Sequence, residues 1–317
     1  MSARTRMMGV LRIFISRIPP RIGNRLADRL GDGVYRFARK SRRYAISNAR
    51  HVLGPRASRQ EVRRVVHGAF HNVMRNYFDL CRAQHMTDEQ IDSTVDFDEQ
   101  GWQRIVALHE QKRGAILVTA HFGSFDMMTQ VLARKGLPLA ALIARVKPVW
   151  LSDFVTNLRG ARGIATIMLE EEEGSGLNLG ALKQAILFLR AGGILGVIAD
   201  RNLEAQGVPI PFFGKETVVA AGVAKMAIRT RAAIIPTFCY RLPGDRYSLI
   251  FEDPIEPPSS SSDEEVRKLL ATIFSRIEYH ISRNPDQWVL LQPVWKPTEQ
   301  ASLPSPARAS TPGHSSH

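Results

Sequence analysis

Short apolar runs that alternate with helical segments are the feature that most restricts how this chain can fold. The runs lack the apolar–polar alternation of a half-exposed strand, which indicates strands covered on both faces. They occupy residues 115–120, 139–144, 164–168, 193–199, 233–238 and 247–251, with helical segments up to 135 and at 149–162, 180–190, 220–230 and 263–283. Since strands joined by helices usually run parallel, we predict an α/β fold with a mixed, mainly parallel sheet flanked by helices.

The basic charge is concentrated at the amino end. The chain carries a net charge of +13, and residues 1–64 hold 17 of the 43 Lys and Arg but only three of the 30 Asp and Glu. Such a block attracts polyanions, either anionic lipid head groups or nucleic acid phosphates. A merely solvated basic face is the plainer alternative.

Residues 7–18 favour lipid over nucleic acid. This segment is mostly apolar, contains Arg12 and Arg17, and ends before Pro19-Pro20. It is shorter than the roughly 20 apolar residues that span a bilayer, and Pro-Pro-Arg follows it where a signal peptide would have small residues. A short interfacial helix fits these features, and an ordinary helix packed on the domain is the alternative. We therefore expect a protein that lies on a membrane surface.

Three regions follow from these patterns. We predict a basic, helical, membrane-associating region at 1–95, an α/β core at 96–297 and a disordered tail at 298–317. The helical pattern of the first region includes a capping box at Ser58 and Glu61. The tail is rich in Ser, Pro and Ala and has no periodicity.

Cysteine and histidine spacing gives little support for a metal. Cys81 and Cys239 are far apart and form no CxxC pair, which argues against a disulfide scaffold and favours a reducing compartment. His67 and His71 lie four residues apart, a spacing that can hold a metal on one helix face. Because the sequence shows no HExxH pattern or nearby carboxylate, we interpret them as surface or packing histidines.

The segment 119–126, Thr-Ala-His-Phe-Gly-Ser-Phe-Asp, points to acid–base chemistry. His121 follows a predicted strand, and Asp126 comes five residues later in a predicted helix. Positions five apart on a regular helix do not share a face, so the two can meet only if His121 lies in a turn, which Gly123 permits. A carboxylate that holds one ring nitrogen leaves the other as a general base.

A protein nucleophile is not expected. Ser124 is not in a GxSxG elbow, and both cysteines lie in apolar contexts typical of buried thiols. His121 would therefore activate a substrate hydroxyl directly. A metal site formed by His121, Asp126 and Asp200, suited to metal-dependent hydrolysis, is an alternative.

Several blocks in fixed order resemble a known family. The blocks are 118–126 with its His-x4-Asp spacing, Arg145 with Pro148, Arg159 with Gly163, 199–203, 207–214 and Ile235-Pro236. The chain resembles the lysophospholipid acyltransferase superfamily over about residues 10–296. Within it, the chain is similar to the bacterial branch of late lipid A acyltransferases and phosphatidylinositol mannoside acyltransferase. Two departures matter: the Glu-Gly-Thr-Arg motif of glycerophosphate-type enzymes is missing, and Arg231 stands where the branch usually has glycine.

The resemblance implies a reaction and a set of site residues. The histidine, His121, would deprotonate an acceptor hydroxyl that attacks an acyl-CoA or acyl carrier protein thioester, and Asp126 would orient the histidine. Asp126 replaces the glutamate common in lipid A enzymes, which favours the mannoside-type relatives. Arg159, Asp200 and Arg145 match positions expected to bind substrate, with surface salt bridges or a turn cap as plainer roles. No metal, cofactor or nucleic acid is expected.

These inferences combine into one function. We expect a membrane-associated O-acyltransferase that moves a fatty acyl chain to a hydroxyl of a membrane glycolipid or lysolipid. It would act on the cytoplasmic face of the inner membrane, held there by anionic lipids. The alternative is a non-enzymatic polyanion-binding protein that uses the basic amino end.

Overall fold

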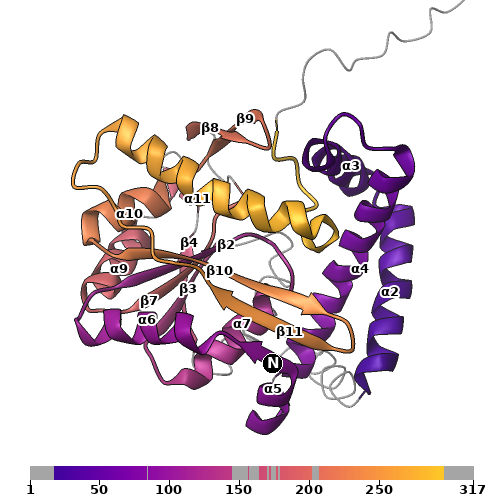
Figure 1. The fold of residues 1–317 in the computed structure, drawn as a ribbon, viewed down its shortest axis with the longest axis horizontal. Helices are drawn as coiled ribbons and strands as arrows, with labels where there is room; N and C mark the ends of the chain where they lie inside the picture. The colour runs from indigo at the N-terminus through magenta and orange to yellow at the C-terminus, as the bar shows by residue number, and fades with distance from the viewer. Residues whose placement is uncertain are drawn as a thin grey trace, which may run out of the picture.

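A seven-stranded sheet forms the centre of the computed structural model (Figure 1). The structure describes residues 18–83, 85–144, 156, 164–169, 171–172, 176–177, 179–201 and 207–295. The strand order is β1-β11-β10-β2-β7-β3-β4. The strands are β1 (Val95–Phe97), β2 (Ala115–Thr119), β3 (Leu139–Ala144), β4 (Ala165–Leu169), β7 (Ile194–Ile198), β10 (Ala233–Leu242) and β11 (Arg246–Phe251). Only the β10–β11 pair is antiparallel among these strands, which confirms the predicted mixed, mainly parallel sheet.

Helices cover both faces of the sheet, as the uniformly apolar strands require. On β2, Ile116 and Val118 point into one core with α9 (Leu179–Arg190), α10 (Gly222–Thr230) and α11 (Asp263–Arg283). The alternate residues of the strand, Ala115 and Leu117, point into a second core with α6 (Glu99–Glu110) and α7 (Phe125–Leu132). In Figure 1, α11 lies above the sheet and α6 below it. The central strand is therefore buried on both sides, and its end is held in a fixed place.

Three amino-terminal helices pack together beside the sheet (Figure 1). They are α2 (Pro20–Phe37), α3 (Arg39–Leu53) and α4 (Arg59–Ala83), and α2 lies along α4. The predicted capping box is confirmed at the start of α4, where Ser58 N donates to Glu61 and Glu61 N donates to the Ser58 hydroxyl. Within the described part of the chain, no helix combines the length and apolar character needed to cross a bilayer.

Some elements differ from the sequence prediction. The pattern did not indicate β1, which is only three residues long, or the hairpin of β8 (Val208–Phe212) and β9 (Lys215–Val219). The remaining short elements are α5 (Asp88–Thr94), η1 (Ala133–Lys135), β5 (Glu171–Glu172), β6 (Gly176–Leu177) and η2 (Pro285–Gln287). Arg231 ends α10 with φ 59°, so it adopts the left-handed conformation that glycine would adopt more easily.

Candidate active site

The ends of two neighbouring parallel strands bring His121 and Asp200 together. Strands β2 and β7 pair in register as far as Thr119 and Ile198, and Ala199 N donates to Thr119 O at 2.8 Å. His121 and Asp200 each follow the last residue of their strand by two positions. The crevice beyond the carboxyl ends of parallel strands is where open α/β sheets bind ligands. Residues 79 positions apart in the sequence thus share one site.

Asp200 holds the His121 ring. The distance from His121 Nδ1 to Asp200 Oδ1 is 2.7 Å, and the His121 backbone N–H donates to Oδ2 at 3.0 Å. Trp288 Nε1 also donates to Oδ2, at 2.8 Å. The Asp200 side chain is fully buried, whereas the His121 side chain is 26% exposed. The carboxylate therefore fixes the Nδ1 side of the ring and leaves Nε2 as the nitrogen that can meet a substrate.

The environment keeps Asp200 ionised. Burial by itself would raise the pKa of this carboxyl group, but the charge of His121 and the hydrogen bonds from His121 and Trp288 outweigh it. The pKa of Asp200 is therefore lowered from its ordinary value. An ionised carboxylate at Nδ1 favours the tautomer in which Nδ1 carries the proton, so Nε2 has a free lone pair. That is the arrangement of a general base.

A tight turn sets the position of the histidine. Gly123 has φ 57°, and a Cβ there would lie 2.0 Å from the Cys239 carbonyl oxygen. The Gly123 and Ser124 amides donate to Gln287 O and Cys239 O, both at 2.8 Å. The His121 carbonyl accepts from Val289 N at 2.8 Å. The glycine is thus required by both its backbone conformation and its close approach to β10.

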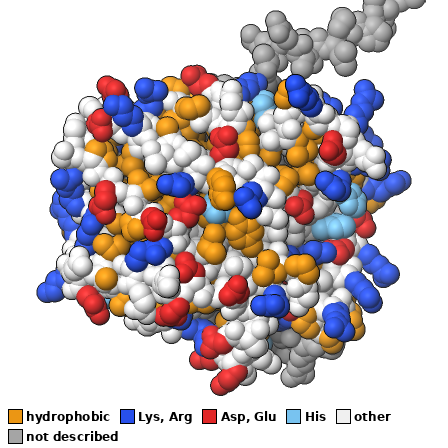
Figure 2. Space-filling model, in the orientation of Figure 1, with side chains coloured by type: hydrophobic (Ala, Val, Ile, Leu, Met, Phe, Trp, Pro, Cys, Tyr) orange, Lys and Arg blue, Asp and Glu red, His pale blue; other side chains and the backbone are white. Residues whose placement is uncertain are grey.

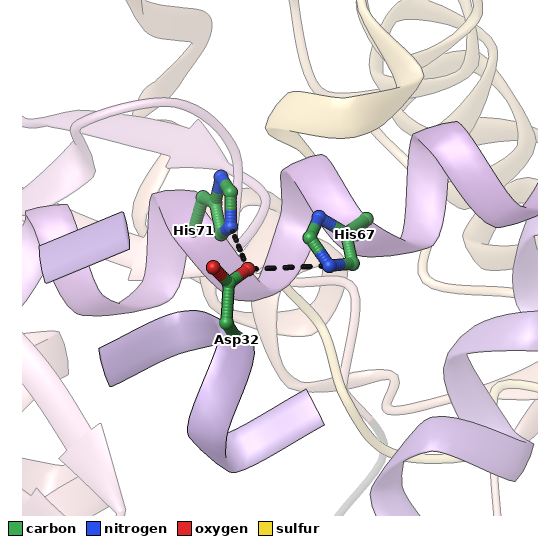
Figure 3. Close-up of side chains that lie close together, drawn as sticks. All are labelled: Asp32, His67 and His71. Atoms are coloured by element: carbon green, nitrogen blue, oxygen red, sulfur yellow. Dashed lines mark hydrogen bonds and ion pairs between the residues drawn. The ribbon is translucent and has the colours of Figure 1, made fainter. Parts of the chain in front are cut away.

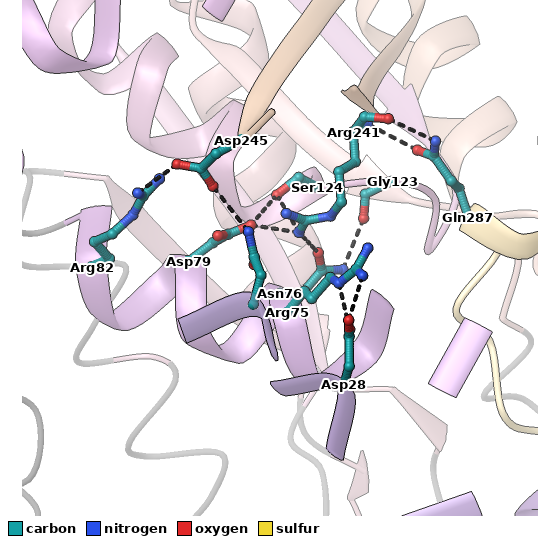
Figure 4. A network of polar contacts seen from close by, with 11 residues as sticks. Asp28, Arg75, Asn76, Asp79, Arg82, Gly123, Ser124, Arg241, Asp245 and Gln287 are labelled. Carbon is teal, nitrogen blue, oxygen red and sulfur yellow. Dashed lines mark hydrogen bonds and ion pairs between the residues drawn. The ribbon is translucent and has the colours of Figure 1, made fainter. Parts of the chain in front are cut away.

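A buried polar network lies beneath this turn (Figure 4). Asn76 on α4 donates from Nδ2 to the Gly123 carbonyl at 2.8 Å, and Arg241 on β10 donates to Asn76 Oδ1 at 2.8 Å. Arg241 also pairs with Asp79, which accepts from the Ser124 hydroxyl at 3.1 Å. Burial would lower the pKa of Arg241, but Asp79 raises it above its ordinary value. The network links α4, the turn and β10, and so restricts movement of the turn that carries His121.

The predicted site residues have different outcomes. Asp126 lies buried in the first turn of α7, and its predicted role in orienting His121 stays a prediction. Asp200, expected from the resemblance to bind substrate, forms the hydrogen bonds to His121 described above; a contact with substrate stays a prediction. Arg145 and Arg159 lie outside the described residues, as does the predicted tail. Sequence reasoning missed Trp288, for which the sequence offers no motif.

Cys81, Cys239 and Ser124, which are not expected to act as nucleophiles, are buried. Both cysteines are free and buried, and burial raises the pKa of Cys239 to about 12. The Ser124 hydroxyl donates to Asp79. Burial of the two thiols and the hydrogen bond of Ser124 make these three side chains poor nucleophiles. Within the described part of the chain, the group of His, Cys and carboxylate side chains with metal-ligand spacing is Asp32, His67 and His71, on α2 and α4.

Comparison with known proteins identifies the family. The family model of bacterial lipid A biosynthesis acyltransferases matches residues 6–297. The chain therefore belongs to this acyltransferase family, which confirms the resemblance noted in the sequence.

Individual relatives narrow the similarity. The chain is 29% identical over 207 residues to the phosphatidylinositol mannoside acyltransferase of Mycolicibacterium smegmatis, a match that covers 65% of this chain and 63% of that protein. It is 26% identical over 182 residues to the protein of the same name in Mycobacterium tuberculosis strain H37Rv, covering 57% and 54%. It is 22% identical over 282 residues to the lipid A biosynthesis acyltransferase of Haemophilus influenzae, covering 87% and 82%. The chain thus spans less than two thirds of the mycobacterial relatives.

Proposed function

We propose that this chain is a membrane-associated O-acyltransferase that transfers a fatty acyl group from a thioester to a hydroxyl of a membrane glycolipid or lysolipid. The observation that carries this proposal is the His121–Asp200 pair at the carboxyl edge of the sheet, in which Asp200 contacts Nδ1 and the His121 side chain is 26% exposed. Membership in an acyltransferase family gives the reaction class.

The reaction needs one proton relay and no covalent enzyme intermediate. Nε2 of His121 takes the proton of the acceptor hydroxyl as its oxygen attacks the thioester carbonyl carbon. The tetrahedral intermediate then collapses, the carbon–sulfur bond breaks, and the imidazolium returns the proton to the leaving thiolate. Asp200 stays ionised throughout and stabilises the imidazolium, as the carboxylate does in a Ser–His–Asp triad. The products are an ester and a free thiol, so atoms and protons balance.

The remaining site residues take supporting roles in this proposal. Asp200 is the carboxylate that orients the ring, because the hydrogen bonds to Nδ1 and to the backbone of His121 both end on it. Asp126 belongs to the same motif and shapes the first turn of α7 next to the base. Arg145 and Arg159 bind anionic groups of the donor or acceptor, a task for which the guanidinium fork is suited. The donor is acyl-CoA or acyl carrier protein.

The acceptor is proposed to be a glycolipid of the membrane. Both groups of relatives are named for acylating glycolipids, a phosphatidylinositol mannoside in one case and lipid A in the other. The Asp126 variant of the motif and the higher identity to the mycobacterial proteins favour a mannoside-like acceptor. An acceptor embedded in the membrane requires an enzyme held at its surface.

Helix α2 supplies a surface suited to lipid. Four large apolar side chains on it are exposed, and their spacing of four, four and seven residues places them on one face. They are Ile22, Leu26, Leu30 and Phe37, exposed by 51%, 43%, 63% and 78%. Arginines flank this face, and Lys and Arg side chains crowd the margin of the molecule formed by α2, α3 and α4 (Figure 2). An apolar stripe bordered by arginine is the pattern of a helix that lies in the head-group region, and we assign it to the cytoplasmic face of the inner membrane.

An acyl-transfer assay tests the reaction. Purified wild-type protein is incubated with total membrane lipid from its own organism and with palmitoyl-CoA as the donor. Palmitoylated acyl carrier protein is the second donor. Free thiol and acylated lipid are followed together, the latter by mass spectrometry. We expect equimolar thiol and a new acylated glycolipid. If neither donor gives lipid product, while the protein binds nucleic acid or anionic vesicles in a salt-dependent manner, the polyanion-binding alternative replaces the enzyme.

A vesicle-binding assay tests the surface. The double variant Leu26→Asp/Leu30→Asp on α2 is compared with Leu187→Asp on α9, where the leucine is 55% exposed. Complete burial of a leucine is worth about 1.5–3 kcal/mol, so we expect the double variant to lose at least about tenfold in affinity for anionic vesicles. Leu187→Asp should bind as wild type does. Equal binding by all three folded proteins would contradict the assignment to α2.

A further inference from the structure

Two histidines and a carboxylate meet at the contact between α2 and α4 (Figure 3). His67 and His71 lie one turn apart on α4, and Asp32 comes from α2, more than 30 residues earlier in the chain. Gly31 makes the approach possible, because a Cβ there would lie 2.9 Å from the His71 ring and 3.0 Å from the Phe70 carbonyl oxygen. The tight helix contact therefore supplies the carboxylate that the linear sequence does not show near the histidine pair.

The three side chains present their ligand atoms to one point. Asp32 Oδ1 lies 2.6 Å from His71 Nε2 and 3.2 Å from His67 Nε2. All three ligand atoms are within 4.8 Å of one another. The side chains are 51%, 22% and 38% exposed for Asp32, His71 and His67, so an ion can reach them from solvent. Bonds of about 2.0–2.2 Å in tetrahedral geometry separate ligand atoms by roughly 3.3 Å, so binding an ion requires the His71–Asp32 contact to open slightly, with the other separations already within 4.8 Å.

A second layer of side chains lies behind the histidines. Asp28 Oδ1 lies 3.7 Å from Nδ1 of His71, on the side of the ring opposite Asp32. Asp28 is itself fixed by Arg75, which donates to both its oxygens at 2.6 and 2.7 Å. The ring of His67 packs edge-on against Tyr35 with centroids 4.8 Å apart. A carboxylate behind the distal nitrogen of a ligating histidine is the usual outer partner in metal sites.

We propose that Asp32, His67 and His71 bind a divalent transition-metal ion of the zinc class, with water completing the coordination. Two imidazoles and one carboxylate suit zinc, cobalt or nickel, whereas calcium and magnesium prefer oxygen ligands alone. The ion joins α2 to α4 and so fixes the helix that carries the exposed apolar face. The site is remote from His121 in sequence and rests on none of the assumptions about acyl transfer.

Metal titration of the full chain tests this site directly. The protein is prepared without a polyhistidine tag and freed of metal by dialysis against chelator. Zinc affinity is measured by competition with a chromophoric chelator, and the visible spectrum of the cobalt form reports coordination. The variants are His67→Gln, His71→Gln and Asp32→Asn. The controls are His85→Gln, an exposed histidine outside the cluster, and His314→Gln/His317→Gln near the end of the sequence.

Wild type and both controls should bind one zinc ion and give the intense visible band of four-coordinate cobalt. Since losing even an outer-shell partner weakens metal binding about 10–100-fold, each cluster variant should lose at least about 100-fold. Zinc should raise the thermal unfolding midpoint of wild type and leave that of the cluster variants unchanged. The proposal would be overturned if wild type did not bind zinc, or if the three cluster variants bound zinc as tightly as wild type does. In that case the cluster is an ion pair between helices.

Discussion

Replacing Asp200 by Asn tests whether this carboxylate sets the protonation of His121. In the wild type, Oδ1 accepts from the ring and Oδ2 accepts from the His121 amide and from Trp288. An asparagine has one acceptor oxygen and one NH2 group. With its NH2 group toward the amide and the indole, two buried donors would lose their partner, at about 1–3 kcal/mol each. The arrangement of lower free energy has the NH2 group of the asparagine pointing toward Nδ1 of His121.

That arrangement reverses the tautomer of His121. Nδ1 must then accept a hydrogen bond, so the proton moves to Nε2, and this nitrogen could no longer take a proton from the proposed acceptor hydroxyl. The corresponding change in a Ser–His–Asp protease lowers kcat by about 10⁴. A similar loss here corresponds to about 5 kcal/mol of transition-state stabilisation. The fold should be kept, because the asparagine oxygen takes the place of Oδ2 and still accepts from the His121 amide and from Trp288.

The assay compares Asp200→Asn with Asp126→Asn under single-turnover conditions, with circular dichroism as the check on folding. We expect a loss of about 10³–10⁴ in the rate of ester formation for Asp200→Asn and a smaller loss for Asp126→Asn. A folded Asp200→Asn protein with a rate within tenfold of wild type would show that Asp200 does not set the tautomer of His121. If Asp126→Asn alone then lost activity, the orienting role would pass to Asp126, as the His-x4-Asp spacing suggests.

Three further predictions concern the residues that support the site. Gly123→Ala should lower the free energy of unfolding by at least about 1–2 kcal/mol, because of the left-handed backbone at this position alone. Gly33 lies on α2 with open space around it, so Gly33→Ala should raise the free energy of unfolding by about 0.5–1 kcal/mol. Urea denaturation measures both. Asp79→Ala leaves the buried Arg241 without its counter-charge and should lower the free energy of unfolding by about 3–5 kcal/mol, with Asp79→Leu/Arg241→Leu losing less. Because the folded-state pKa of Asp200 is lowered, its stabilisation is complete above the unfolded pKa of about 3.9 and is lost as pH falls through the folded value. The stability difference between wild type and Asp200→Asn should therefore narrow below about pH 4, and a difference that grows there would contradict this.

The sheet was predictable because its strands are buried on both faces. Runs such as 115–120 and 139–144 are apolar throughout, so they stand out from the amphipathic helices around them. Strand β1 was missed because three residues carry no periodic signal. The β8–β9 hairpin was missed because Pro209 and Pro211 argue against an ordinary strand, although proline is tolerated on edge strands of this kind.

The site was only partly predictable for a related reason. His121 and the glycine turn lie in one continuous motif, and both are where the sequence analysis expected them. The contact between His121 and Asp200 depends on the pairing of β2 with β7, which no local pattern encodes. The same limit applies to Asp32, whose approach to His67 depends on the packing of two helices. Chemistry formed by long-range pairing becomes visible only when the strands and helices are placed.

Replacing His121 by alanine removes the proposed general base. The rate of ester formation is measured in a single turnover with wild type and with a His121→Ala protein shown to be folded by its thermal unfolding midpoint. The side chain is partly exposed, and the His121 amide and Trp288 still donate to Asp200 after truncation, so we expect the fold to be kept with a lower unfolding midpoint. We predict that the rate of ester formation falls by about 10²–10⁴-fold. A folded His121→Ala protein that forms ester at a rate close to that of wild type would show that His121 is not the general base.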